Sequence, residues 1–279
     1  MLSTRILTAA VLIPLVLAAM FLLPPPGWAV ASLAVIVLAA TEWANLAGYR
    51  GPGWVGFVAG VLAIGTALLV APAAHGGRGL PNGVVAAACG VATLFWLFAA
   101  LPWIASRWKS PSGVVLAITG WIVLTGAWVA LVALQAHSPW LVLAAMATVW
   151  IADTAAYFTG RTFGRRKLAP LVSPGKSWEG VYGALAAVSV YALLLVPMAK
   201  AAGYAGTTSP VTIAIWVAAL LAIAALSVLG DLFESLLKRQ AEVKDSGRLL
   251  PGHGGILDRV DALLAAMPPA ALLALFFLD

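Results

Sequence analysis

The chain has 279 residues and carries few charges for its length. Hydrophobic residues make up 63% of it and charged residues 9%, and its mean hydropathy is +1.02. In a typical soluble protein, about 25% of the residues are charged. A water-soluble globule of this composition would expose much apolar surface, and a disordered chain would need the opposite bias. We therefore expect an all-α protein that crosses a membrane several times.

Nine stretches are long and apolar enough to cross a bilayer as helices, which takes about 20 residues. They are 6–23, 28–47, 54–72, 83–104, 114–134, 140–158, 180–199, 211–229 and 262–278. The first follows Arg5 as a signal peptide would, but it ends in three prolines without a small-residue cleavage pattern, so we expect it to be retained. Pro268 and Pro269 interrupt the last stretch, and its limits are poorly defined.

The charges are concentrated in one part of the chain. Residues 153–261 hold 19 of the 26 charged residues. The net charge is +6, but a basic groove for nucleic acid would need a polar domain to present it, and the sequence contains none. No nucleic-acid partner is therefore expected. The single Cys89 cannot form an intramolecular disulfide.

The basic residues also predict how the chain is oriented. With the N-terminus in the cytoplasm, 14 of the 16 basic residues lie inside, and only Arg78 and Lys200 lie outside. The positive-inside rule favours this arrangement. It predicts a multi-pass protein of the cell membrane whose Asp279 faces outward.

Acidic residues from distant segments fall at one depth in this orientation. Asp153, Asp231, Asp258 and Asp261 all lie near the cytoplasmic ends of their spans, and Glu42 does so in the second span. Carboxylates at that depth are costly unless they are paired or bind cations, so the set favours a functional site. For one acid alone, such as Glu42, snorkelling or pairing with a nearby Lys or Arg explains the position equally well.

The segment 230–261 contains the residue types used in phosphoryl and nucleotidyl transfer. If the eighth span continues as a helix, four polar residues share one face, and two further acids lie one turn apart at the next helix start: Asp231, Glu234, Ser235 and Lys238, then Asp258 and Asp261. Such carboxylates suit Mg²⁺, and the glycine-rich turn 251–255 between them exposes N–H groups to a phosphate. The cations for a polyanionic substrate are Lys238, Arg239, Lys244, Arg248 and Arg259.

Two further features allow more than one interpretation. His253 has no second His or Cys nearby, so a phosphate contact or a turn role is favoured over proton transfer or metal binding. The basic cluster 161–167 is typical of a segment attracted to anionic lipid, but Ser173, Lys176 and Ser177 add groups suited to a phosphate. The segment lacks the spacing of a P-loop.

The stretch from Ser235 to Asp261 has a long, specific pattern, S-x-L-K-R-x4-K-D-x-G-x3-P-G-H-G-G-x-L-D-R-x-D. It resembles the signature of the phosphatidate cytidylyltransferases, and residues 230–232 and the block 153–180 are similar to that family as well. Two positions depart from its pattern. Ala155 stands where members often carry glycine, and Ser177 stands where threonine is common.

The resemblance implies an enzyme that condenses CTP with phosphatidic acid to give CDP-diacylglycerol and pyrophosphate. It also implies Mg²⁺ as cofactor, a second cation such as K⁺ in the same site, and a homodimer. The implied metal ligands are Asp231, Asp258 and Asp261, and the implied catalytic groups add Lys238, Arg239 and His253. The implied substrate-binding residues are Ser235, Lys244, Asp245, Gly254, Gly255, Arg259, Lys167, Ser173, Lys176, Ser177 and Asp153.

On this interpretation residues 1–135 are N-terminal transmembrane helices, and residues 136–279 form a catalytic region with cytoplasmic loops 159–179 and 230–261. Two alternatives stay open. A CTP-dependent kinase of a polyprenol or similar lipid would release CDP and would need a base such as His253 or Asp245. An ion-coupled transporter would also contain intramembrane acids, but here the acids gather at one face and no inverted repeat is evident.

Overall fold

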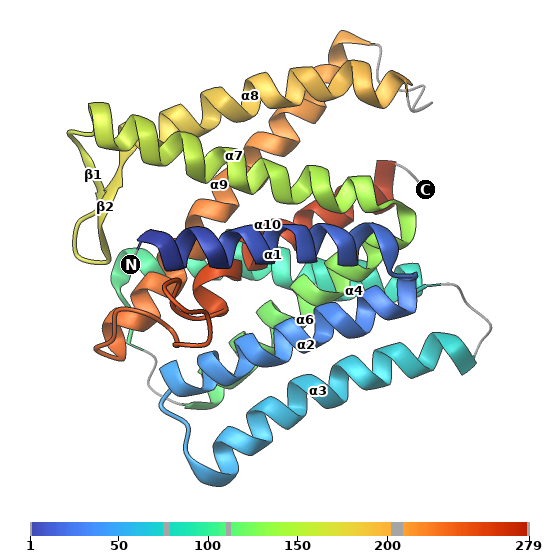
Figure 1. The fold of residues 1–279 in the computed structure, drawn as a ribbon, viewed down its shortest axis with the longest axis vertical. Coiled ribbons are helices and arrows are strands. Elements are labelled where there is room, and N and C mark those ends of the chain that lie inside the picture. Colours follow the sequence, from blue (N-terminus) through green and yellow to red (C-terminus); the bar gives the residue numbers. More distant parts are fainter. Residues whose placement is uncertain (1, 75–78, 110–112, 202–208, 278–279) are drawn as a thin grey trace.

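The structure is a computed structural model that describes residues 2–74, 79–109, 113–201 and 209–277 (Figure 1). The described chain is a bundle of helices with one short β-hairpin, which confirms the all-α membrane class. The elements are α1 (Leu2–Leu22), α2 (Pro25–Leu46), α3 (Gly51–Ala74), α4 (Asn82–Leu94), the π-helix η1 (Phe95–Ala100), α5 (Leu101–Ser106), α6 (Gly113–His137), α7 (Pro139–Phe163), β1 (Lys167–Ala169), β2 (Ser173–Ser177), α8 (Trp178–Ala201), α9 (Pro210–Gln240) and α10 (Leu257–Phe277).

Eight helical stretches in the described residues are long and apolar enough to cross a membrane, and they correspond to the second to ninth expected spans. One of them, Asn82–Ser106, runs without interruption through α4, η1 and α5. The first expected span is also helical, as α1.

The two helices that carry the predicted acids are longer than their apolar stretches. α9 continues to Gln240, eleven residues beyond the expected end at 229, and α10 begins at Leu257, five residues before the expected start at 262. Hydropathy shows only the apolar part of a helix, whereas helical hydrogen bonding extends into the adjoining polar residues. These residues follow the apolar part in α9 and precede it in α10. Asp231, Asp258 and Asp261 therefore all lie within helices.

α10 is the central helix of the bundle. It packs against α9 and also against α2, α4 and α6, so helices of both predicted parts share one core. α7 and α8 lie side by side, α9 crosses them, and α3 lies at the edge (Figure 1). The hairpin, the N-terminus and the segment 241–256 all lie at the left end of the bundle in that view.

Pro268 and Pro269 lie inside α10, where the sequence suggested an interruption. Proline has no N–H, so Pro268 leaves the carbonyl of Leu264 without its partner in the helix. The indole N–H of the buried Trp96, on η1, donates to this carbonyl at 3.1 Å. A neighbouring helix thus supplies the donor that Pro268 lacks, and α10 continues through both prolines.

Candidate active site

α9 and α10 approach each other closely at Gly230. A Cβ atom at this position would collide with the carbonyl oxygen of Asp261 on α10. Only a glycine therefore allows the close approach, which places the polar face of α9, beginning at the next residue, Asp231, beside the first turns of α10. Along this face the Ser235 hydroxyl donates to Asp231 Oδ1 at 3.2 Å.

Lys238 connects two buried carboxylates from the two helices. Its Nζ lies 2.6 Å from Glu234 Oε2, one turn earlier on α9, and 2.6 Å from Asp258 Oδ1 on α10. The exposed fractions of the Glu234 and Asp258 side chains are 4% and 6%. A buried carboxylate is costly unless it is paired, so Lys238 serves here as the counter-ion that stabilises both acids.

The other oxygen of Asp258 is held by the segment before α10. Asp258 Oδ2 accepts from the Ser246 N–H at 2.9 Å, the Ser246 hydroxyl at 3.0 Å and the Gly255 N–H at 2.8 Å. The turn reaches Asp258 because Gly254 adopts a φ of +84°, which favours glycine. Together with Lys238, these donors occupy both oxygens of Asp258.

Asp231 lies in a more open part of the same site. Lys176, on β2, places its Nζ 2.7 Å from Asp231 Oδ2, and the exposed fractions of the two side chains are 22% and 34%. Asp153, an exposed residue of α7, interacts electrostatically with both. The structure therefore brings together the block 153–180 and the segment 230–261, which lie far apart in the sequence.

The hairpin that carries Lys176 is fixed to the helices at both ends. Arg239 Nε donates to the carbonyl of Val172 at 3.3 Å. Ser177 is buried at the start of α8, and its hydroxyl accepts from the Gly180 N–H at 3.2 Å, which caps that helix. Lys167 pairs with Ser177 across the hairpin, as Ala169 does with Ser173.

The remaining predicted residues lie around the turn 241–256. Lys244 and Asp245 are exposed there. The Arg259 Nε and Nη2 atoms donate to the carbonyl of His253 at 3.1 and 2.6 Å. Within the described part of the chain the buried Nδ1 of His253 has no hydrogen-bond partner, whereas the His253 backbone N–H donates to the carbonyl of Leu250 at 2.9 Å.

Comparison with known proteins identifies the family. The sequence matches the Cytidylyltransferase family over residues 3–277. It is 42% identical to a phosphatidate cytidylyltransferase of Pseudomonas aeruginosa over 98% of this chain and 97% of that protein. A protein of the same name from Haemophilus influenzae is 38% identical over 96% of each chain, and one from Brucella suis is 53% identical over 47% of this chain. The chain belongs to the cytidylyltransferase family.

The three acids implied as metal ligands, Asp231, Asp258 and Asp261, have different surroundings in the described structure. Among its described residues, no three Asp, Glu, His or Cys side chains are placed to hold a metal. Asp258 is fully engaged by its donors, whereas Asp231 is partly exposed, and Asp261, which lies deeper on α10, interacts with it electrostatically. Mg²⁺ needs only one or two carboxylates when water and phosphate oxygens complete its shell. The partly exposed Asp231 fits an Mg²⁺ ion that shares its coordination with a nucleotide, and Asp261 is its nearest acidic neighbour by electrostatic interaction.

One contributor to the site was not assigned from the sequence. Glu42, on α2, is buried and accepts hydrogen bonds from Ser246, Ile256 and Leu257, just beside Asp258. It neither snorkels nor pairs with a Lys or Arg in the described structure, so both simple explanations of its position were wrong. Its sequence signal was a single acid near the end of an apolar stretch, which does not identify a partner more than 200 residues away.

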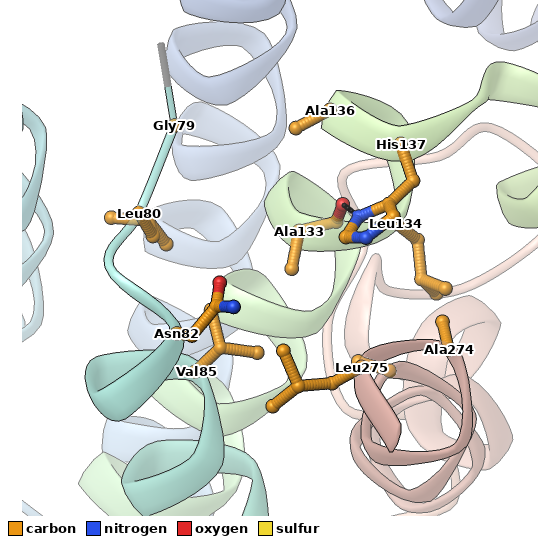
Figure 2. A pocket seen from close by; sticks show the side chains of 11 residues that line it. Gly79, Leu80, Asn82, Val85, Ala133, Leu134, Ala136, His137, Ala274 and Leu275 are labelled. Carbon is orange, nitrogen blue, oxygen red and sulfur yellow. Dashed lines mark hydrogen bonds between the residues drawn. The ribbon is translucent and has the colours of Figure 1, made fainter. Parts of the chain in front are cut away.

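A cavity of about 390 Å³ lies at the other end of α10. Small and apolar side chains line it, together with Asn82 and His137 (Figure 2). Its α10 residues begin at Ala271, about 20 Å along the helix from Asp258 at 1.5 Å per residue. The cavity is therefore separate from the carboxylate site.

Proposed function

We propose that this cytidylyltransferase condenses CTP with phosphatidic acid to give CDP-diacylglycerol and pyrophosphate, at the cytoplasmic face of the cell membrane and as a homodimer. The observation that carries the proposal is the open Asp231–Lys176 pair, which joins the segments 153–180 and 230–261 beside a fixed carboxylate network. The relatives named phosphatidate cytidylyltransferase support the choice of substrates.

The chemistry of this reaction suits the charges of the site. The phosphate of phosphatidic acid is already an anionic nucleophile, so attack on the α-phosphorus of CTP needs little help from a base. The barrier is the repulsion between two anions, and fixed cations at the reacting phosphates lower it. Lys176 is such a cation, and its partner Asp231 is exposed enough for a phosphate oxygen to replace it.

Asp231 and Asp261 would hold Mg²⁺, which when bound supplies charge neutralisation for the triphosphate and the leaving pyrophosphate. The positions of the hairpin and of the segment 241–256 at one end of the bundle support a site at the membrane surface (Figure 1). There the lipid phosphate and dissolved CTP can meet while the acyl chains stay in the bilayer. Holding both phosphates in register supplies a further part of the rate enhancement.

The proposal is tested with the purified protein in detergent micelles that contain phosphatidic acid, with CTP and Mg²⁺ added. Pyrophosphate release is followed over time, and the lipid product is identified by mass spectrometry. We expect CDP-diacylglycerol in the wild type and loss of turnover in Asp231→Asn. Glu242→Gln, which removes one exposed acid from the turn after α9, is the matched control and should stay active.

Other products would contradict the proposal. CDP formed with a lipid alcohol acceptor would identify a kinase. Flux of a substrate through liposomes by folded protein, without any nucleotide turnover, would identify a transporter.

A further inference from the structure

Glu42, on α2, makes three hydrogen bonds to the described segment 246–258, to which Thr8 of α1 also bonds through the Pro251 carbonyl. Its side chain is buried, with 2% of the residue exposed, near the end of α2. Its Oε1 accepts from the Ile256 N–H at 3.0 Å, and its Oε2 accepts from the Leu257 N–H at 2.8 Å and from the Ser246 hydroxyl at 2.9 Å. Each oxygen thus has a defined donor.

Two of these donors belong to the start of α10. Leu257 is the first residue of that helix, and the N–H groups of a first helical turn have no partner inside the helix. A helix start also carries partial positive charge, which favours an anion there. Glu42 therefore caps α10 from a different helix and fixes where α10 begins.

The third donor connects Glu42 to Asp258. The Ser246 hydroxyl lies 2.9 Å from Glu42 Oε2 and 3.0 Å from Asp258 Oδ2, and its oxygen accepts from the Asp258 N–H at 3.3 Å. A hydroxyl has one hydrogen, so Ser246 can donate to only one of the two carboxylates at a time. The position of Asp258 relative to α2 is consequently set through one serine.

The surrounding backbone is shaped to fit the Glu42 carboxyl group. A Cβ atom at Gly247 or at Gly255 would collide with it. Within the described chain its partners are N–H and O–H groups, and it forms no ion pair. Apolar side chains of similar size often stabilise a protein core at least as well as buried charges do. The arrangement is thus better explained by the geometry that it imposes than by a gain in stability.

We infer that Glu42 is a positioning residue for the transfer reaction, which holds the glycine-rich turn and the start of α10 so that Asp258 keeps its place in the site. It touches no substrate group and acts through Ser246, Ile256 and Leu257. The claim about turnover rests on the proposed function, whereas the claim about the turn does not.

Glu42→Gln is the test, because it preserves the size of the side chain. Its amide nitrogen must replace one of the two oxygens, so the N–H of Ile256 or of Leu257 then faces a donor instead of an acceptor. We expect kcat to fall about 10- to 100-fold, the range that a misplacement of about 1 Å produces, with little change in KM for either substrate. Thr41→Val, on the same helix, is the control, since in the described structure the Thr41 hydroxyl bonds to Leu38 of α2 and not to the segment 246–258.

Hydrogen–deuterium exchange supplies a measurement that needs no substrate. In Glu42→Gln the amides of residues 246–257 should exchange faster, while those of α6 keep the wild-type rate. Ser246→Ala removes the connection to Asp258 but keeps both backbone bonds of Glu42, so it should lower kcat even if Glu42→Gln does not fold. If Glu42 acts through Ser246, the decrease in log kcat in the double variant should be smaller than the sum of the decreases in the two single variants.

The possible outcomes separate this inference from the proposed function. Wild-type exchange and wild-type kcat in Glu42→Gln would overturn the inference. A loss of activity that only follows the loss of folded protein, with unchanged exchange in the folded fraction, would overturn it too. If the wild type itself turns over no CTP, the proposed function fails. Amide exchange at 246–257 still tests the role of Glu42 in that case, and a rate in Glu42→Gln equal to that of the wild type would overturn it.

Discussion

Two lysine–carboxylate contacts, each with one partner on α9, have nearly equal lengths but different surroundings. Lys238 lies 2.6 Å from Asp258, and Lys176 lies 2.7 Å from Asp231. In the first contact 14% of the lysine and 6% of the aspartate side chain are exposed, whereas in the second these fractions are 22% and 34%. The chemistry of the partners is the same, and the access of water differs.

The difference indicates two roles. A buried pair cannot lose one partner without leaving an unpaired charge, so Lys238 and Asp258 form a fixed part of the site. An exposed pair contributes little to stability and its partners can be exchanged for ligands. Sequence position alone does not separate these roles, because Asp231 and Lys238 lie two turns apart on one helix face.

Asp258→Ala should have the largest effect, because it breaks the buried contact. It leaves Lys238 facing Glu234 alone and removes the acceptor of Ser246 and Gly255. We expect turnover to be lost and unfolding to become easier by about 3–5 kcal/mol, as for other broken buried pairs. Thermal unfolding in detergent and pyrophosphate release measure the two effects. Normal turnover would contradict both the assignment of the site and the proposed reaction.

Asp231→Asn should affect turnover alone, because it changes the open contact. We expect a loss of about 10²–10³-fold in kcat, the size found when one group that stabilises a developing charge is removed. The thermal midpoint should stay close to that of the wild type, since an exposed pair contributes at most about 1 kcal/mol. A large drop in the midpoint would show that the open pair is structural too, and the comparison would fail.

Lys176→Ala should have a smaller effect on the same measurement. It removes one of several cations near the phosphates, and we expect kcat/KM to fall about 10-fold or more, which corresponds to about 1.4 kcal/mol. Lys176→Arg keeps the charge and serves as the control, so it should retain more activity than the alanine variant. Equal losses in both variants would mean that the shape of the lysine, and not its charge, matters.

Ser177→Ala should have the smallest effect. It removes the cap of α8, and such caps contribute about 1 kcal/mol. We expect a lower thermal midpoint, with turnover of CTP and phosphatidic acid retained. A loss of turnover at an unchanged midpoint would instead support the substrate contact that the resemblance implied for this hydroxyl.

The membrane class and the spans from α2 to α10 were predictable, because about 20 consecutive apolar residues have few other uses. The polar face of α9 was also predictable, since its residues follow one another at intervals of a helical turn. The hairpin was not expected. Its strands contain Lys167, Ser173 and Pro174, without the alternation of apolar and polar residues that indicates a strand.

The partners within the site were less predictable than its members. The sequence suggested Asp258 as a metal ligand, but it could not show that Lys238, Ser246 and Gly255 occupy the carboxylate. The same holds for Trp96, whose bond to Leu264 depends on how η1 packs against α10. Such contacts arise from the packing of separate helices, and no local periodicity reports them.

The contacts of Glu42 also set an order of events during synthesis. Its donors Ser246 and Leu257 follow it by 204 and 215 residues. At about 5–20 residues per second, a ribosome needs roughly 10–40 s to make them after Glu42. During that interval the carboxylate lacks these donors, and Asp258 does not yet exist. A chain that stops before Asp258 therefore has no assembled site, so the site forms only after α10 has begun to be made.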